Sequence, residues 1–184
     1  MSLLLNGESL SLVRGGRLLF EALDLQLDAG EALHVIGPNG SGKSSLIRLV
    51  AGLLKPSAGR IARADAALAD EGLALDRELP LGKALAFWGG RGLTQALAAF
   101  ALEDLAEVPV RLLSTGQAKR ARLARVMASG ASLWLLDEPL NGLDSNGVTE
   151  LDCAIAAHRA SGGAVLAASH LPLAGAWRSL ELGA

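Results

Sequence analysis

The stretch with the clearest chemistry is rich in glycine and runs Gly37-Pro38-Asn39-Gly40-Ser41-Gly42-Lys43-Ser44-Ser45. Residues 37–44 match the G-x-x-x-x-G-K-[ST] phosphate loop, whose glycines let consecutive backbone N–H groups curl around an anion. Lys43 offers a point charge to the outer phosphates, and the hydroxyl of Ser44 is a ligand for Mg²⁺. Apolar residues 32–36 precede the loop and an amphipathic segment follows it, which favours this interpretation over a chance glycine turn. We therefore predict that residues 37–45 bind ATP with Mg²⁺.

Two adjacent carboxylates, Asp137 and Glu138, follow the apolar residues 133–136. In an open parallel sheet, ligands bind beyond the carboxyl ends of the strands, where the phosphate loop also lies. Asp137 would hold Mg²⁺, and Glu138 could polarise an attacking water as general base. An acid pair in a solvated turn is the alternative, and it becomes much weaker downstream of a phosphate loop.

His170 follows an expected strand over 163–168 and so reaches the same sheet edge, close to a γ-phosphate or its attacking water. A packed or solvated histidine is the alternative for this residue. For His34, which lies inside a strand, His158, on a polar helix face, and Cys153, we expect structural roles only.

These residues need a scaffold of alternating strands and helices. Hydrophobic periodicity predicts strands over 3–13, 18–27, 32–36, 132–136 and 163–168, and helices from 43, over 116–128 and over 146–160. A small helical insertion is expected over about 78–112, whereas residues 60–79 give no clear pattern. The order predicts one α/β domain over 1–184: a P-loop NTPase with a mostly parallel central sheet, an N-terminal antiparallel β portion and the helical insertion.

Composition excludes several other classes of protein. Lys plus Arg number 17 and Asp plus Glu 19, so the net charge of −2 gives no electrostatic case for nucleic-acid binding. Hydrophobic residues make up 51%, which excludes a disordered chain, and a single Cys excludes a disulfide framework. The start of the chain lacks the basic region of a signal peptide, and glycines and a proline interrupt the uncharged run between Arg159 and Arg178. The mean hydropathy of +0.35 is high, so part of the apolar surface is expected to meet a partner.

A further turn, Leu113-Ser114-Thr115-Gly116-Gln117, resembles the signature motif of ATP-binding-cassette ATPases. Physically it is a polar turn that opens a helix and forms a second anion cradle. The resemblance implies that Ser114, Thr115, Gly116 and Gln117 complete the ATP site of a second copy, so that the protein is a homodimer when ATP is bound. The alternative is a capped helix with a solvated basic face, and we expect Lys119, Arg120, Arg122 and Arg125 to form such a face.

The order of motifs over residues 30–172 resembles the same family: phosphate loop, insertion, signature, acid pair, Asn141–Asp144 and His170. It implies that Asp144 contacts the second copy. Several stretches, including 134–140 and 169–173, resemble the ATP-binding subunits of bacterial haem exporters for cytochrome c maturation. This resemblance implies a peripheral protein on the cytoplasmic face of the inner membrane. Its partner would be an integral permease of the CcmB type, with or without a CcmC-like subunit. An ATPase of another transporter, or a nucleotide-binding regulatory module with weak turnover, are the alternatives.

The chain departs from that family in two places. The family usually places an aromatic ring upstream of the phosphate loop to stack on adenine, but this chain has no Tyr, and residues 12–16 supply only Leu, Val, Arg and Gly. Val13 or the Arg14 guanidinium would therefore have to support the base. The Gln expected at the entrance to the helical insertion is missing from residues 69–73. Either Asp70 or Glu71 substitutes for it near the metal, or both are solvated loop charges.

Overall fold

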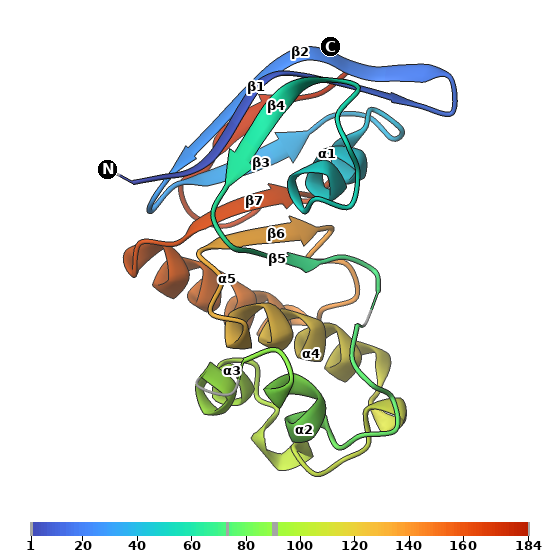
Figure 1. The fold of residues 1–184 in the computed structure, drawn as a ribbon. Helices are drawn as coiled ribbons and strands as arrows, with labels where there is room; N and C mark the ends of the chain where they lie inside the picture. Colours follow the sequence, from blue (N-terminus) through green and yellow to red (C-terminus); the bar gives the residue numbers. More distant parts are fainter. Residues whose placement is uncertain (1, 73, 90–91, 184) are drawn as a thin grey trace.

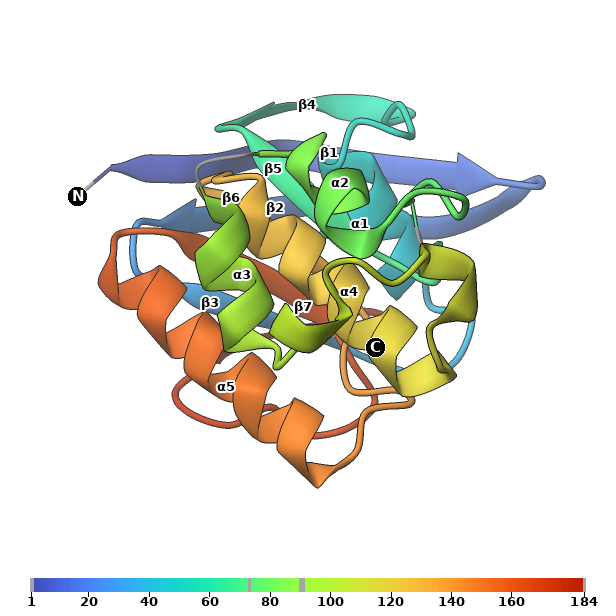
Figure 2. The same ribbon diagram turned by 90° about the horizontal axis from the view of Figure 1, so that it is seen from below.

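The computed structural model describes residues 2–72, 74–89 and 92–183. Figure 1 shows them as successive layers: an antiparallel sheet, helix α1 (Lys43–Val50), a parallel sheet, and then the remaining helices on the opposite face. Figure 2 shows from below how α2 (Leu81–Ala86) and α3 (Leu93–Ala99) lie over α4 (Thr115–Ala128). Helix α5 (Ser145–Ala160) runs beside α4.

The antiparallel sheet has the strand order β2-β1-β4. It contains β1 (Leu3–Arg14), β2 (Arg17–Asp28) and β4 (Ala58–Arg63). The turn between β1 and β2 uses Gly15 at φ +58° and Gly16 at φ +76°, the left-handed pair that a tight two-residue hairpin requires. This hairpin extends over the start of α1 and carries Arg14 with it.

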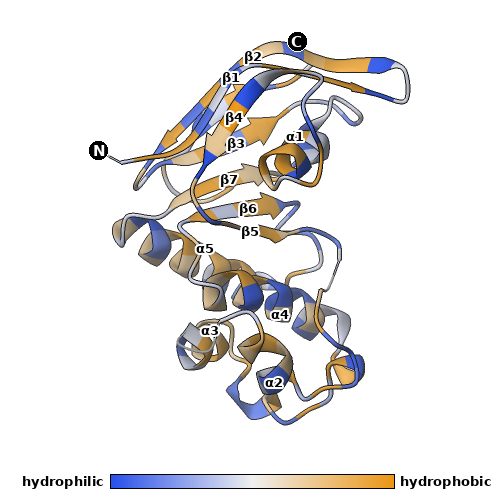
Figure 3. Cartoon of the chain, in the orientation of Figure 1, coloured by the Kyte–Doolittle hydropathy of each residue, from blue (hydrophilic) through white to orange (hydrophobic). Residues whose placement is uncertain are grey.

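The central sheet has the order β5-β6-β7-β3-β8, and all its pairings are parallel in the part of the chain that the structure describes. Its strands are β3 (Ala32–Ile36), β5 (Ala66–Ala69), β6 (Leu133–Asp137), β7 (Ala164–Ala168) and β8 (Arg178–Glu181). Every residue of β6 and β7 is buried, as expected for strands covered on both faces. Figure 3 shows the resulting hydrophobic colour along this sheet.

Alternate side chains of the parallel strands supply two separate cores. Leu133 and Leu135 of β6 pack toward α1 and the antiparallel sheet, whereas Trp134 and Leu136 pack toward α4 and α5. The sheet therefore lies between two apolar layers. Functional side chains are expected on the loops at the ends of its strands.

The expected α/β class, with a parallel sheet and an antiparallel N-terminal portion, is confirmed. Residues 60–79, which gave no clear pattern, contain most of β4 and all of β5, and the strand at 178–181 was missed. Both β4 and β8 are largely exposed, so they lack the apolar runs that identify buried strands. The region expected to be helical contains α2, α3 and two short 3₁₀ turns at Glu103–Leu105 and Val110–Leu112.

Candidate nucleotide site

A cavity of about 540 Å³ lies at the carboxyl edge of the parallel sheet. Its walls come from the β1–β2 hairpin, the loop after β3, the start of α1, and the segments after β6 and β7. The lining residues are Arg14, Gly15, Leu19, Asn39, Gly40, Gly42, Lys43, Ser44, Ser45, Glu138, Asn141 and His170. Expected site residues that are separated by more than a hundred positions in the chain therefore meet in one cavity.

The phosphate loop connects β3 to α1, and several of its backbone positions have a positive φ that favours glycine. Gly37 has φ +143°, and a Cβ there would lie 2.3 Å from the carbonyl oxygen of Leu182. Gly42 caps α1 at φ +106° without a side-chain hydrogen bond to the helix, and no acid occupies the first turn. The Nζ atom of Lys43 donates to the carbonyl oxygens of Gly37 at 2.7 Å and Pro38 at 3.0 Å. The helix thus presents its N–H groups and one ammonium to the cavity.

Ser44 and Asp137 lie together beneath this loop. The Ser44 hydroxyl donates to Asp137 Oδ1 at 2.9 Å. Burial raises the pKa of the Asp137 carboxyl, while the hydrogen bond from Ser44 opposes that rise. A hydroxyl and a carboxylate oxygen suit a hard cation such as Mg²⁺. Among the described residues no group of three or more His, Cys, Asp or Glu gathers as a metal cage, and Mg²⁺ bound mainly by phosphates and water needs none.

Glu138 and His170 lie next to each other on the cavity wall. His170 Nε2 lies 3.4 Å from Glu138 Oε1, and the His170 backbone N–H donates to Glu138 Oε2 at 3.3 Å. Glu138 has φ +50°, a left-handed conformation that is uncommon for a residue other than glycine. His34 supports the same loop, because its Nε2 lies 2.9 Å from the carbonyl oxygen of Ser169.

The part of the cavity wall that comes from the β1–β2 hairpin is formed by Arg14, Gly15 and Leu19. Arg14 Nη1 lies 3.4 Å from the Ser45 hydroxyl, whereas Val13 does not line the cavity. Of the two supports that the sequence offered for a base, the structure brings only Arg14 to the site. Leu19 and Asn141 were not singled out as lining residues. The position of Asn141 after Glu138 was a usable signal, but nothing in the sequence marks Leu19.

The signature turn lies outside this cavity, in a small pocket of about 190 Å³ of its own. Ser114, Gly116 and Gln117 line it together with Asp144, while Thr115 is exposed at the start of α4. Ser114 and Gln117 form a capping box, and Asp144 caps α5 by accepting from the Gly147 N–H at 2.8 Å. Two helix ends thus meet on the surface beside Asp144.

The expectation of a solvated basic face on α4 was wrong. Lys119 and Arg125 are each only 6% exposed, and hydrophilic segments interrupt α4 in Figure 3. Lys119 Nζ donates to the carbonyl oxygen of Glu138 at 2.9 Å, and Arg125 donates to that of Leu68. Burial lowers the pKa of both side chains. These residues reach the carboxyl ends of strands, a tertiary contact that helical periodicity cannot reveal.

Asp70 and Glu71 lie near the site but not on the cavity wall. Asp70 Oδ1 accepts from the Gly72 N–H at 2.9 Å, and Oδ2 lies 3.9 Å from Arg48 of α1. Arg122 of α4 donates to the backbone carbonyl oxygens of both residues. The stretch therefore joins α1 to α4; Leu73, at its end, lies outside the described residues.

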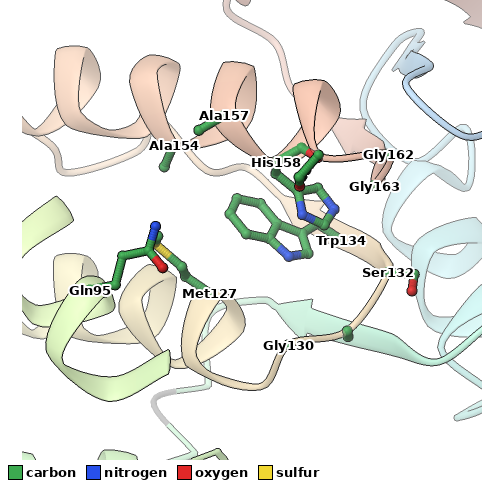
Figure 4. Close-up of a pocket in the computed structure, with 12 residues that line it drawn as sticks. Gln95, Met127, Gly130, Ser132, Trp134, Ala154, Ala157, His158, Gly162 and Gly163 are labelled. Atoms are coloured by element: carbon green, nitrogen blue, oxygen red, sulfur yellow. Dashed lines mark hydrogen bonds between the residues drawn. The ribbon is translucent and has the colours of Figure 1, made fainter. Parts of the chain in front are cut away.

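A second cavity of about 400 Å³ lies at the opposite end of β6, between α3, α4 and α5 (Figure 4). Trp134 and His158 stack there with ring centroids 4.1 Å apart, and burial lowers the pKa of His158. A Cβ at Gly163 would lie 2.2 Å from the His158 ring. His158 is therefore a packed residue, as expected, although it does not lie on a solvated helix face.

Comparison with known proteins finds relatives that match most of the chain. Residues 20–141 match the family model described as ABC transporter. The chain is 55% identical to the cytochrome c biogenesis ATP-binding export protein CcmA of Sphingopyxis alaskensis, over 95% of this chain and 93% of the relative. It is 60% identical to the protein of the same name from Novosphingobium aromaticivorans, over 88% and 85% of the two chains.

Two solved structures share the fold. The structure of an ATP-binding subunit of an ABC transporter has a TM-score of 0.85 at 25% identity, covering 91% of this chain and 80% of that one. A putative ABC transporter ATP-binding protein from Pyrococcus furiosus has a TM-score of 0.84 at 21% identity, covering 98% of each chain. No helix among the described residues is both long and apolar enough to cross a membrane.

Proposed function

The chain belongs to the ABC transporter family as an ATP-binding subunit, and on that premise we propose that it hydrolyses ATP to drive haem export for cytochrome c biogenesis. The observation that carries the proposal is the single cavity that brings the phosphate loop together with Glu138 and His170, while Asp137 is hydrogen-bonded to Ser44 of that loop. Support for the export role comes from relatives that are 55–60% identical and named for it. The chain would act on the cytoplasmic face of the bacterial inner membrane, bound to an integral permease of the CcmB type, with or without a CcmC-like subunit.

The phosphate loop would bind the triphosphate. The open N–H groups at the start of α1 and the Lys43 ammonium provide a positive, donor-rich wall for the β- and γ-phosphates. Residues 37–45 together supply this cradle. Mg²⁺, held by Ser44 and by Asp137, would neutralise the charge that develops on the phosphate oxygens.

Glu138 would act as the general base. Its carboxylate lies in the cavity beside His170, so a water between it and the γ-phosphate could lose a proton to it. His170 would orient the carboxylate and contact the γ-phosphate. On the hairpin side of the cavity, the guanidinium of Arg14 would lie against the face of the base.

A second copy of the chain would complete the site. The turn made by Ser114, Thr115, Gly116 and Gln117 has no use for the phosphates of its own chain, because it lines a separate pocket. In a head-to-tail pair it would contact the γ-phosphate bound by the partner, and Asp144, which lines the same pocket, would lie at the contact between the copies.

Two measurements test the proposal. Purified protein with ATP and Mg²⁺ should release phosphate at steady state; binding without turnover would instead identify a regulatory module. Copurification from membranes should then identify an integral subunit of the haem exporter. Copurification with a permease for another cargo would leave the proposed ATPase activity intact but overturn the role in haem export.

A further inference from the structure

Lys119 is a buried charge that the mechanism above does not use. It lies on α4, the helix that begins directly after Ser114, and it is 6% exposed. Its Nζ donates to the backbone carbonyl oxygen of Glu138 at 2.9 Å. Burial lowers the pKa of this side chain, opposed by the nearby carboxylates of Glu71, Asp137 and Glu138. Burying an ammonium costs free energy, so its partners must offset that cost.

The carbonyl that Lys119 contacts belongs to a residue in an unfavourable backbone conformation. Glu138 has φ +50°, although it carries a full side chain. Its N–H donates to the carbonyl oxygen of Ala168 in β7 at 2.8 Å, so the peptide groups on both sides of its Cα are held. A charge-assisted hydrogen bond is comparable in size to the cost of keeping such a residue in the left-handed region.

We propose that Lys119 is a positioning residue for ATP hydrolysis: it holds Glu138 in the left-handed conformation from which its carboxylate meets His170 in the nucleotide cavity. Without this contact, the backbone of Glu138 would relax to a negative φ. Its carboxylate would then no longer point at the water that attacks the γ-phosphate. This inference rests on the proposed function of Glu138. It adds that α4 carries both the signature turn and the support of the catalytic carboxylate.

Arg125 offers a matched control on the same helix. It is equally buried at 6% exposure and also donates to a backbone carbonyl, but its partner is Leu68 in β5. If burial of a basic residue on α4 matters only for packing, Lys119→Met and Arg125→Met should behave alike. If Lys119 positions Glu138, the two variants should differ in kcat and not in thermal stability.

The experiment measures steady-state phosphate release, ATP affinity by calorimetry and the thermal unfolding midpoint. For Lys119→Met we expect kcat to fall about 10- to 100-fold, as for misplacement of a reacting group, with ATP affinity within about 3-fold of the unmodified protein. Lys119→Arg should recover most of that loss. Arg125→Met should lose similar thermal stability yet keep kcat within about 3-fold. In a Glu138→Gln background, Lys119→Met should lower the residual rate no further.

A kcat for Lys119→Met within 3-fold of the unmodified protein, or an equal loss in Arg125→Met, overturns the inference. Should Lys119→Met not fold, Lys119→Leu takes its place, because it also removes the donor to the carbonyl, and the same two criteria apply to it. Unmodified protein that binds ATP without hydrolysing it would refute the proposed function instead, so the two failures are distinguishable.

Discussion

Two helices of this protein begin at polar turns that could bind phosphate. They differ in whether side chains already bond to the N–H groups at the helix start. At the start of α1, Gly42 caps the helix without any side-chain hydrogen bond. At the start of α4, the Ser114 hydroxyl accepts from the Gln117 N–H at 3.3 Å, and Gln117 Oε1 accepts from the Ser114 N–H at 2.9 Å. Neither first turn contains an acid, so both helix ends are electrostatically open to an anion.

This difference indicates which helix N-terminus can bind phosphate without a second copy of the chain. The N–H groups of α1 have no internal competitor, and Lys43 and Ser44 stand beside them, so this end is prepared for the triphosphate in a single chain. The capping box of α4 already satisfies two donors, so an anion there must displace side chains or use the remaining groups. Such an end suits a weak contact that is made only once another site has delivered the phosphate.

The largest expected effect tests whether the α1 end holds the reacting groups. Glu138→Gln should keep ATP binding but lower the hydrolysis rate about 10²- to 10⁴-fold, because the amide cannot accept the proton of the attacking water. ATP should then persist and hold two chains together through the α4 turn. Phosphate release and light scattering with and without ATP measure both results. A monomer in both conditions would contradict the shared site, unless the permease is required for pairing.

The next effect tests whether the α1 end binds without help. Lys43→Ala should abolish tight ATP binding, since removal of the charge-assisted contact to the phosphates costs about 1.5–3 kcal/mol, roughly a 10- to 100-fold loss. Calorimetry on the isolated chain measures it. Near-normal affinity in this variant would remove the phosphate-loop assignment.

A smaller effect tests the dependent role of the α4 end. Ser114→Ala should lower the free energy of unfolding by about 1 kcal/mol through loss of the cap, without changing ATP affinity in the isolated chain. Combined with Glu138→Gln, it should weaken the pairing of two chains in ATP. Denaturant titration and light scattering give the two values. Equal loss of ATP affinity in Ser114→Ala and Lys43→Ala would erase the contrast between the helix ends.

A weaker effect is expected at Arg14, which would add one contact to the nucleotide base beside the phosphate site at the start of α1. Arg14→Ala should reduce ATP affinity about two- to five-fold, because an exposed cation–π contact is worth about 0.5–1 kcal/mol. Arg14→Tyr should restore or improve binding by supplying a ring. Arg17→Ala, on the other side of the hairpin turn, is the control and should leave affinity unchanged. No response to any change at Arg14 would exclude it as the support of the base.

The smallest effect concerns Asp70 and Glu71, which join the two helices through Arg48 of α1 and Arg122 of α4. We expect Asp70→Ala and Glu71→Ala, alone or together, to change ATPase activity or its Mg²⁺ dependence only a few-fold at most, because Asp70 already serves a turn and Arg48. A Mg²⁺ titration of all three variants measures this. If none of them responds, the idea that either acid replaces the missing Gln is refuted and both are ordinary loop charges.

The sequence predicted the elements whose patterns are local. Ala32–Ile36, the phosphate loop and α1 were recognisable because an apolar strand, a glycine-rich loop and an amphipathic helix are contiguous. The meeting of Glu138 with His170 followed from the rule that parallel strands end at one edge. The roles of Lys119 and Arg125 could not be predicted, since their partners are backbone carbonyls on other elements, 19 and 57 positions away in the chain. Strand β8 was missed because its exposed residues carry no apolar run.

The position of β3 in its sheet has a consequence for the order of synthesis. This strand carries the phosphate loop, yet both of its neighbours, β7 and β8, come from much later in the chain. His34 in β3 meets Ser169 across 135 positions, which a ribosome needs roughly 7–30 s to translate. Until those residues emerge, β3 has two unpaired edges, and the loop that follows it lacks the acids and the histidine opposite. The complete nucleotide cavity therefore cannot form before His170 has been synthesised, so it is among the last features of the fold to assemble.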